Sequence, residues 1–332
     1  MSFSLENISV ITITKIDQSS YNLVKTLKSF SETVSGGYKE YIVVYAGRSD
    51  LDLQSELKDL RIKNLRFIYS EVSNWSYQRN IGINNALGDL ILFLDDGMRF
   101  QKGWFKELVD VFRNYENCGV VCGVVLPDQS KSIWGKCQGI LNHPGGGYSL
   151  LKEHTYETQF FHTGICLGKR ELFKIMFDED LKYGCEDMDI SVRIKKTFPD
   201  VKFFINPKAI SFHHTRDEVS EIWRWMVRYG KGRVDIYRKH GLKMSGFFVH
   251  KFILFLFFAL TSSFVFSYFS FLILLIFFYI FYLIKLSKYR KHSDLKTFLF
   301  LPFVFWIMNI AFDFGRISRT LSYGRNSFKK SF

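Results

Sequence analysis

Two acidic motifs, far apart in the sequence, are the residues best suited to chemistry. The first is Asp95 and Asp96, which follow the apolar stretch "DLILFL", a pattern typical of a buried strand. The second is "CEDMD", in which Glu186, Asp187 and Asp189 open a helical pattern. Carboxylates at a strand end suit a divalent cation that is shared with phosphate groups. A carboxylate at a helix start is kept ionised by the helix dipole and can accept a proton.

The pair Asp95–Asp96 has three interpretations at this stage. The carboxylates could hydrogen-bond a loop or cap a helix, they could form a phospho-acceptor pocket like that of receiver domains, or they could hold Mg²⁺ or Mn²⁺ against a diphosphate. A receiver pocket requires an acidic pair after the first strand, and "VITITKID" supplies none. The pattern therefore favours the metal and diphosphate interpretation, with the loop role as its structural alternative.

The surrounding elements place these motifs at one edge of a sheet. Apolar, β-branched segments predict strands at 8–14, 40–47, 65–71 and 89–96, and helical spacing predicts helices at 20–33, 55–63 and 76–88. This alternation predicts an α/β fold with a mostly parallel sheet flanked by helices. Ligands of such sheets lie beyond the carboxyl ends of the strands, where Asp95 and Asp96 stand.

The second half of this region continues the same pattern. The sequence predicts a helix at 103–115, a strand at 118–127, an irregular stretch at 128–160, a strand then a helix at 163–176, a helix at 184–199 and, at 201–214, a strand pair broken by Pro207.

The ordered set of motifs resembles the family 2 glycosyltransferases of the GT-A (Rossmann-like) fold. The matching segments cover roughly residues 8–240 and are "ISVITIT", "EYIVVYAGRSD", "YQRNIGINNALGDLILFLDDG", "TGICLGKRELF", "GCEDMDISVRI" and "KAISFHH". The following "RYGKGRVDIYRKHG" and hydrophobic helices look like bacterial membrane-attached members that build exopolysaccharide, capsule or O-antigen. The resemblance implies an inverting, hexosyltransferase-type enzyme that moves a sugar from a nucleotide sugar to a hydroxyl of a lipid-linked (polyprenyl-diphosphate) glycan.

The resemblance also implies roles for individual residues. Asp187 matches the general base, with Glu186 and Asp189 beside it. The residues that match a donor site are Thr14, Arg48, Asp50, Arg79, Asn80, Asp95 and Asp96. Those that match a site for Mg²⁺ or Mn²⁺ are Asp95, Asp96, His213 and His214. Those that match contacts to the acceptor or its diphosphate are His162, Arg224, Trp225 and Arg228, the last three around a variant of the QxxRW motif.

Two positions depart from the family pattern. The second strand of the family usually ends in "DDGS-D", but here Tyr45 and Ala46 replace the two acids. The third position of the DXD motif, which usually holds a metal-binding Asp, is Gly97. The base of the nucleotide and the dependence on metal are therefore open, and Asp96 or cationic side chains could take over part of the metal's environment.

Charge and composition point to a membrane. The 332-residue chain has a formal net charge of +13, but it carries no recognised nucleic-acid motif, so nucleic acid is excluded as a predicted partner. Its basic residues flank apolar runs in the last third, a pattern that favours anionic membrane lipids. Five cysteines without CxxC spacing predict reduced thiols in the cytosol, and the N-terminus lacks the pattern of a signal peptide.

The apolar runs predict the remaining organisation. The segment between Lys251 and Lys285 has no charged residue and exceeds one span of about 20 residues, so it predicts two short spans with basic cytosolic flanks. The predicted parts are a catalytic domain at 1–218, amphipathic interfacial helices at 219–245, a transmembrane hairpin at 246–285, and, at 286–332, a basic loop, a re-entrant or interfacial hydrophobic helix and a basic tail. We therefore expect an inner (plasma) membrane protein with its catalytic domain on the cytoplasmic side.

Two alternative functions remain at this stage. A processive polysaccharide synthase would use the same motifs, although two or three spans are few for a translocation channel. A non-catalytic membrane-bound scaffold that binds nucleotide sugars would explain Gly97 and "YAGRSD", whereas the complete "CEDMD" motif favours an enzyme.

Overall fold

The computed structural model describes residues 7–16, 21–48, 57, 60–142, 147–242, 254–255, 257–261, 264 and 268–329, with the side chains of Tyr268 and of 324–329 left aside. Its internal contacts divide the chain into two compact units. The first unit comprises Met1–Asp128, His143–Lys182 and Glu186–His214, and the second comprises Gln129–Asn142, Tyr183–Cys185 and Thr215–Phe332.

The first unit is built on one mixed sheet. Its strands are β1 (Ile8–Ile16), β2 (Glu40–Gly47), β3 (Leu65–Tyr69), β4 (Leu90–Asp95), β5 (Met98–Phe100), β6 (Cys118–Pro127), β7 (Tyr156–Thr158), β8 (Ile165–Lys169) and β9 (Lys202–His213). The order across the described sheet is β3-β2-β1-β4-β8-β6-β9-β5, and β7 pairs with β9. Strands β3, β2, β1 and β4 are mutually parallel, whereas β8 is antiparallel to both of its neighbours. The carboxyl ends of the four parallel strands therefore meet at one edge.

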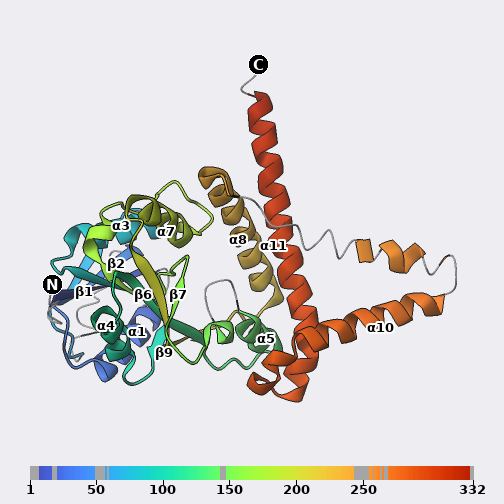
Figure 1. Ribbon diagram of the computed structural model, residues 1–332, viewed down its shortest axis with the longest axis horizontal. Helices are drawn as coiled ribbons and strands as arrows, with labels where there is room; N and C mark the ends of the chain where they lie inside the picture. Colours follow the sequence, from blue (N-terminus) through green and yellow to red (C-terminus); the bar gives the residue numbers. More distant parts are fainter. Residues whose placement is uncertain are drawn as a thin grey trace. The chain divides into compact units, whose positions relative to one another are not determined.

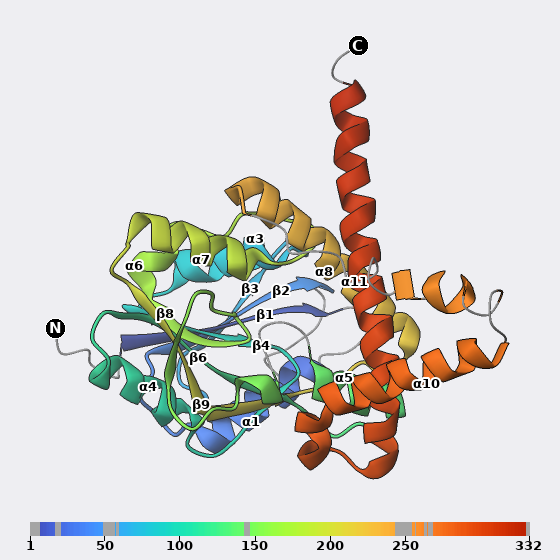
Figure 2. The ribbon, with the colours of Figure 1, turned by 45° about the vertical axis from the view of Figure 1, so that its right-hand side comes forward.

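Helices cover both faces of this sheet (Figure 2). They are α1 (Tyr21–Thr33), α3 (Trp75–Asn85), α4 (Trp104–Asn114), α6 (Arg170–Phe173) and α7 (Glu186–Thr197), with a 3-10 turn η2 at Tyr148–Leu150. Helices α1 and α4 pack on one face and α3 and α7 on the other. The side chains of β1 alternate accordingly, because Val10 joins the first core and Ile11 the second.

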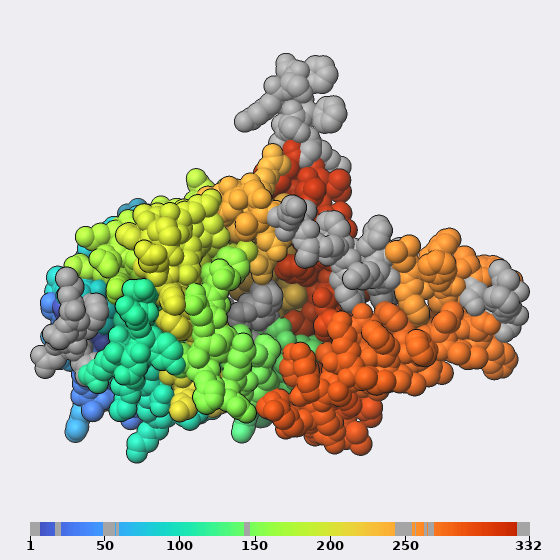
Figure 3. Space-filling view, in the orientation of Figure 1, coloured from blue at the N-terminus to red at the C-terminus, as the bar shows by residue number. Residues whose placement is uncertain are grey.

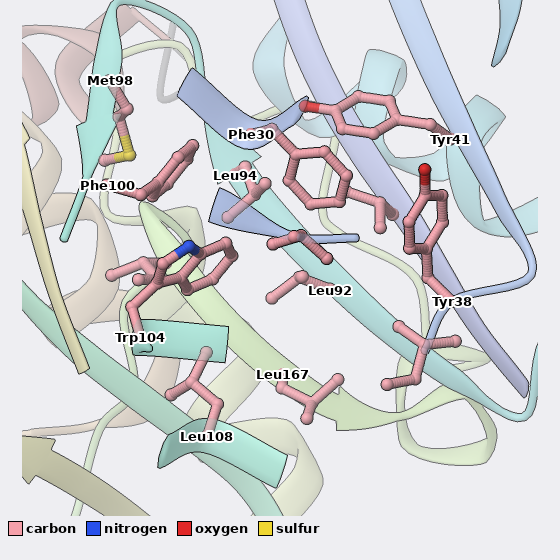
Figure 4. Close-up of a cluster of buried hydrophobic side chains, with 14 of the residues drawn as sticks. Phe30, Tyr38, Tyr41, Leu92, Leu94, Met98, Phe100, Trp104, Leu108 and Leu167 are labelled. Carbon is pink, nitrogen blue, oxygen red and sulfur yellow. The ribbon is translucent and has the colours of Figure 1, made fainter. Parts of the chain in front are cut away.

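The core under α1 and α4 is rich in aromatic rings (Figure 4). Phe30 of α1 meets Tyr41 of β2 edge to ring, and Phe100 of β5 stacks on Trp104 of α4 with ring centroids 4.4 Å apart. Trp104 is fully buried, and its indole Nε1 donates to Thr33 of α1. This packing holds β5, the strand that follows β4, against α1, because the backbone N–H groups of Met98 and Phe100 donate to the Thr26 and Ser29 hydroxyls of α1.

The predicted strand and helix pattern is confirmed over most of the first unit. Strands appear where the sequence predicts them at 8–14, 40–47, 65–71, 89–96 and 118–127, and helices appear at α1, α3, α4, α6 and α7. The predicted helix at 55–63 falls largely outside the described residues.

The predicted strand pair broken by Pro207 is wrong, because β9 runs through this proline as one strand. The pairing with β6 shifts register between Cys122 and Val124, so that β9 bulges around Pro207. The side-chain oxygen of Asn206 accepts the backbone N–H of Lys208 across the proline. The bulge therefore accommodates Pro207, which has no N–H to donate to the neighbouring strand, and β9 continues to His213.

The second unit is helical. Its described elements are α5 (Ile133–Leu141), α8 (Val219–His240), α10 (Tyr268–Lys285), a 3-10 segment η3 (Ser287–His292) and α11 (Leu295–Lys329). Helices α8 and α11 lie side by side (Figure 1), and glycines allow their close approach. A side chain at Gly230 would clash with the carbonyl of Phe312, and one at Gly315 with the carbonyl of Val227.

Helix α5 lies inside the stretch 128–160, which the sequence predicts to be irregular, so that prediction is wrong here. Ser132 caps the helix by accepting the N–H of Trp134. Gly135 and Gly139 lower the intrinsic helix propensity of this segment, which hides the helical pattern. Gly135 is required because a side chain there would clash with Asp217.

The apolar C-terminal third forms helices where the structure describes it. Helix α11 is continuous from Leu295, through Pro302, well past Phe314. Among the described residues, α11 is long and apolar enough over Leu295–Tyr323 to cross a bilayer, and Phe269–Lys285 is a shorter apolar helix. The turns predicted for the hairpin, at 261–263 or 267–270, fall largely outside the described residues. The hairpin and the re-entrant helix stay predictions.

Candidate active site

The ends of β1 and β4 meet at the carboxyl edge of the sheet. The Thr14 hydroxyl of β1 donates to Asp96 Oδ2 over 2.6 Å, and the backbone N–H of Asp95 donates to the carbonyl of Gly164 over 3.0 Å. The side chain of Asp95 remains 41% exposed. Asp96 is fixed by the sheet, whereas Asp95 stays accessible to a ligand.

Arg79 of α3 joins the two acidic motifs. Its guanidinium donates to Glu186 Oε1 over 2.7 Å and contacts Asp95 Oδ1 at 3.4 Å. Arg79 itself is buried. Residues that are about a hundred positions apart in the sequence, Asp95 and Glu186, are therefore held by one side chain.

The electrostatics of the site follow from burial and these contacts. Burial disfavours the charged form of Arg79, but Glu186 and Asp95 outweigh it and raise the pKa of the guanidinium. Burial raises the pKa of Asp96, an effect that the hydrogen bond from Thr14 opposes. The negative charge of Asp95 raises the pKa of Asp96 further, and nearby His213 lowers it. Asp96 is thus a carboxylate that favours a nearby cation.

The three acids of α7 have different environments. Glu186 is buried against Arg79, and Asp189 is fully buried with its Oδ2 accepting from Arg193 over 2.8 Å. Asp187 is only partly buried and accepts the N–H of Met188 at the start of α7. Its charge also acts on Arg79. Of the three predicted acids, Asp187 is the one that is partly exposed.

The backbone explains Gly97, which stands where the family has an Asp. Gly97 has φ +73°, in the left-handed region that disfavours other residues. A Cβ at this position would lie 3.1 Å from His214 Nδ1. The His214 ring stacks on the His213 ring at 4.2 Å. An imidazole from the end of β9 therefore lies beside the position that a side chain at 97 would occupy.

The oxygen atoms at this edge fit a hard divalent cation whose remaining coordination positions would be filled by phosphate groups of a substrate. Among the residues that the structure describes, no three His, Cys, Asp or Glu side chains form a metal-binding group by themselves. Mg²⁺ and Mn²⁺ usually bind through one or two carboxylates plus substrate phosphates, and Asp95 and Asp96 are the two carboxylates at this edge that would hold such a cation. His213 is close enough to affect Asp96 electrostatically.

The same edge continues over β2 and β3. Tyr45 is the register partner of Thr14 on one side and of Tyr69 on the other, and the two tyrosine rings meet at 5.5 Å. Buried Gln78 ties these strand ends together by donating to the carbonyls of Thr14 and Val44. Sequence reasoning missed this role of Gln78; the only signal was a polar residue inside the "YQRN" segment.

Some residues that the resemblance implied have other contacts. Asn80 bonds to the backbone of Phe177 and to Glu179, so it holds the loop before α7. The ring of His162 contacts the carbonyl of Gly123 at 3.1 Å. Arg48 follows β2, where its backbone N–H donates to Ile16, and Asp50 lies outside the described residues.

The residues of the QxxRW variant lie in the second unit, on α8. Trp225 and Arg228 are partly buried, whereas Arg224 is exposed. The guanidinium of Arg228 lies over the ring of Tyr229. Arg224 is therefore in contact with solvent, whereas Trp225 and Arg228 are partly covered by other residues.

Comparison with known proteins identifies the family. Residues 9–177, just over half of the chain, match the family described as glycosyl transferase family 2. The chain belongs to glycosyl transferase family 2. The match contains Thr14, Arg79, Asp95 and Asp96, and it ends before the acids of α7.

Two curated relatives are similar to this family 2 glycosyltransferase. One is the dolichyl N-acetyl-alpha-D-glucosaminyl phosphate 3-beta-D-2,3-diacetamido-2,3-dideoxy-beta-D-glucuronosyltransferase of Methanococcus voltae, 24% identical over 232 residues that cover 65% of this chain and 70% of that protein. The other is the O-antigen biosynthesis protein RfbC of Myxococcus xanthus, 25% identical over 142 residues. That match covers 39% of this chain and spans only 11% of RfbC.

Solved structures confirm the GT-A fold class. The mannosyltransferase PcManGT of Pyrobaculum calidifontis, solved with GDP-Man and Mn²⁺, superposes with a TM-score of 0.55 at 14% identity and covers 94% of this chain and 86% of its own. GalNAc-T7, solved with UDP, GalNAc and Mn²⁺, has a TM-score of 0.50 at 15% identity, over 69% of this chain and 49% of its own.

Proposed function

We propose that this protein is an inverting glycosyltransferase that moves a sugar from a nucleotide sugar to a hydroxyl of a lipid-linked glycan. The observation that carries this proposal is the bridge by Arg79, which holds Asp95 and Glu186 in one site. A carboxylate for the diphosphate side and a carboxylate for the acceptor side are both required for a single displacement. Membership of family 2 and the names of the relatives support the same reaction class.

Asp187 is the general base in this proposal. Glu186 is paired with Arg79, and Asp189 is fully buried against Arg193, so both have structural partners. Asp187 is partly exposed and stands at the N-terminus of α7, where the helix dipole stabilises negative charge. It can therefore accept a proton from a bound hydroxyl at neutral pH.

The reaction balances as one displacement. Asp187 takes the proton of the acceptor hydroxyl while the hydroxyl oxygen forms a bond to the anomeric carbon. The bond from that carbon to the diphosphate oxygen breaks, and the nucleoside diphosphate leaves with the electron pair. Because attack and departure occur on opposite faces, the anomeric configuration inverts.

The leaving diphosphate binds at the carboxyl edge of β4 in this proposal. Asp95 and Asp96 would hold Mg²⁺ or Mn²⁺ there, with His213 or His214 beside them, and the cation would neutralise charge that develops on the diphosphate. Mn²⁺ in the structures of PcManGT and GalNAc-T7 supports a divalent cation. Thr14 orients Asp96, and Arg79 orients Asp95, by the contacts described above.

The acceptor is lipid-linked in this proposal, and the protein works at the cytoplasmic face of the inner (plasma) membrane. Helix α10, drawn in orange in Figure 3, carries a set of exposed apolar side chains, which are Phe269, Ile273, Ile276, Phe277, Ile280, Phe281 and Ile284. Exposed apolar residues at helical spacing favour contact with lipid. The name of the M. voltae relative includes a dolichyl phosphate, which supports a lipid carrier. The name of RfbC, an O-antigen biosynthesis protein, supports a role in surface polysaccharide assembly.

The test is transfer by the purified full chain with a panel of nucleotide sugars and a lipid-linked acceptor. We expect Asp187→Asn to lower the transfer rate about a thousandfold, because general base catalysis contributes roughly 10²–10⁴. Donor binding should stay at the wild-type level. Asp200→Asn, an exposed carboxylate just after α7, is the matched control and should transfer normally.

Three outcomes decide between the candidates. Normal transfer by Asp187→Asn would refute its role as base. Nucleotide binding without transfer by the wild type, for every donor and acceptor, would favour the non-catalytic scaffold. Long polymers from a single binding event, seen on a gel, would favour a processive synthase.

A further inference from the structure

Two cysteines of the first unit face each other across neighbouring strands. Cys122 of β6 and Cys166 of β8 are register partners in an antiparallel pair. Such partners have Cα atoms about 4.5–5.5 Å apart, which lies inside the range that a disulfide spans. Both side chains belong to the second core, on the sheet face that α3 and α7 cover. These two residues, the dithiol pair, are therefore placed for a direct bond between their sulfur atoms.

The two thiols are reduced in this structure and form a chain of hydrogen bonds. The Cys166 thiol donates to the Cys122 sulfur, and the Cys122 thiol donates to the carbonyl of His162 over 3.2 Å. Both cysteine side chains are fully buried. The chain of donors holds the two sulfur atoms in contact before any covalent bond forms between them.

The surroundings make Cys122 the more reactive member of the pair. Burial raises the pKa of both thiols. On Cys122, the hydrogen bond from Cys166 and the charge of His162 outweigh burial and lower the pKa, whereas the neighbouring sulfur raises the pKa of Cys166 further. Because the thiolate is the nucleophilic form of cysteine, we expect an oxidant to react first with Cys122.

Another cysteine of β6 has a different environment. Cys118 lies earlier in the same strand, but it belongs to the first core, which α1 and α4 cover. Burial raises the pKa of its thiol to about 12. Its register partner on β9 is Lys202, which offers no sulfur. Cys118 is therefore the matched comparison for the dithiol pair.

The dithiol pair is connected to the proposed donor site by the residues that lead into β8. The carbonyl of Gly164, two positions before Cys166, accepts the backbone N–H of Asp95 over 3.0 Å. A Cβ at Gly164 would lie 3.3 Å from Asp95 Oδ2, so this backbone also borders the carboxylate. Cys166 itself is the register partner of Phe93, two residues before Asp95 in β4. A movement of Cys166 is therefore passed to Asp95 through a short stretch of paired backbone.

We propose that the dithiol pair is a site of reversible oxidation, which hydrogen peroxide closes to a disulfide, and that closure weakens binding at the donor site. The formation of the disulfide is independent of the proposed function, whereas its effect on donor binding rests on that function. A disulfide brings the two sulfur atoms to about 2.05 Å, so closure draws β6 and β8 together. The backbone before β8 then shifts and displaces Asp95.

The oxidation balances in two steps. The Cys122 thiolate attacks one oxygen of hydrogen peroxide, the O–O bond breaks, and hydroxide leaves, so that Cys122 becomes a sulfenic acid. The Cys166 sulfur then attacks the Cys122 sulfur and loses its proton, and the hydroxyl group leaves as water. The two thiols together lose two protons and two electrons, and hydrogen peroxide is reduced to two molecules of water. Local opening of the end of the strand pair gives this small oxidant access to the core.

The first experiment maps the disulfides of the purified full chain after treatment with hydrogen peroxide. The remaining thiols are alkylated, the chain is digested, and the peptides are identified by mass spectrometry. We expect a linked peptide that joins Cys122 to Cys166, lighter by two hydrogen atoms than its two parts and separated by dithiothreitol. The wild type alone decides this result, so it does not depend on whether any variant folds.

Three variants show that the link is specific. Cys118→Ala should form it at the wild-type level, whereas Cys122→Ala and Cys166→Ala remove it. In Cys166→Ala, dimedone should trap a sulfenic acid at Cys122, because this residue reacts first and has lost the thiol that resolves it. Thermal unfolding midpoints of the reduced variants near that of the wild type show that they are folded.

The second experiment measures binding of the nucleoside diphosphate that the reduced wild type binds most tightly. We expect the oxidised wild type to bind it at least about fivefold more weakly, the lower end of typical coupling between two sites, and dithiothreitol to restore binding. Cys118→Ala should lose affinity on oxidation as the wild type does. In Cys122→Ala, which cannot form the disulfide, peroxide should leave binding unchanged.

The outcomes separate this inference from the proposed function. A folded wild type that gives no link between Cys122 and Cys166, or gives equal links to Cys118, Cys137 or Cys185, would overturn the oxidation site. A disulfide that leaves nucleotide binding unchanged would overturn its connection to the donor site. A reduced wild type that binds no nucleotide would refute the proposed function, and the disulfide map would still decide whether the oxidation site exists.

Discussion

Two buried polar networks of this protein differ in their balance of charge. At the sheet edge of the first unit, the described residues place Arg79 among the acids Asp95, Glu186 and Asp187, with Asp96 beside Asp95. Between α8 and α11 of the second unit, Asp235 accepts from Arg319 over 2.7 Å and from the Tyr323 hydroxyl over 2.8 Å.

The difference separates a site from a structural network. In the helical network each acid has its own arginine, as Asp235 has Arg319 and Asp313 has Arg316 at 3.1 Å. At the sheet edge, the acids named above outnumber the arginine that contacts them among the described residues, and such an excess costs folding free energy unless a cation or a proton is added. An excess of one charge sign in a buried, ordered place therefore indicates binding or catalysis, whereas matched pairs indicate packing.

The largest expected effect comes from removing the cation of the sheet edge. Arg79→Gln leaves Glu186 buried without its ion pair, which should lower the free energy of unfolding by about 3–5 kcal/mol. Urea unfolding of the full chain measures this. Glu186→Gln in the same chain should restore part of the loss, because the two residues contact each other. Additive effects of the two substitutions would show that Arg79 and Glu186 do not interact.

A smaller loss of stability is expected from the helical network. Asp235→Asn weakens the contacts to Arg319 and Tyr323 and should lower the free energy of unfolding by about 2 kcal/mol, since hydrogen bonds to charged groups contribute roughly 1.5–3 kcal/mol. Nucleotide binding should not change. A variant with normal stability but impaired donor binding would contradict the structural role and erase the contrast between the networks.

The smallest effect, with the opposite sign, is expected at Asp96. Burial raises the pKa of this carboxyl in the folded protein, so its ionisation opposes folding. The penalty is absent below the usual carboxyl pKa of about 4 and fully present above the raised folded value. Without divalent cation, Asp96→Asn should therefore unfold at a higher temperature than the wild type at pH 7.

The pH profile checks the sign of this effect. The difference in unfolding temperature should shrink as the pH falls toward 4, because Asp96 is then neutral in both states. Asp110→Asn, on the exposed side of α4, is the comparison variant. A wild type that is more stable than Asp96→Asn at pH 7 in the absence of divalent cation would show that the carboxylate is compensated within the protein.

The strands of the first unit were predictable because each is a local pattern. Continuous apolar runs such as those of β4 and β6 are typical of strands that are buried on both faces, because a strand with one exposed face would alternate with polar residues. Helix α5 and the unbroken β9 were not predictable from local patterns. Gly135 is needed in α5 because a side chain there would clash with Asp217, and the bulge at Pro207 is set by the pairing of β9 with β6. Such contacts join distant parts of the chain and leave no local periodicity.

The candidate site divides in the same way. Reading the residues along the chain was enough to predict the family and to propose the acids at 95, 96 and 187, because acids after a core strand and at a helix start are local features. The tertiary structure decided which of the neighbouring residues pair with one another. Asp189 pairs with Arg193 and Glu186 with Arg79. The guanidinium of Arg216, rather than that of Arg224, lies over the Trp225 ring. The physical reason is that the protonation state and the contacts of a charged side chain depend on its burial and on its partner. Both are set by residues that are far away in the sequence.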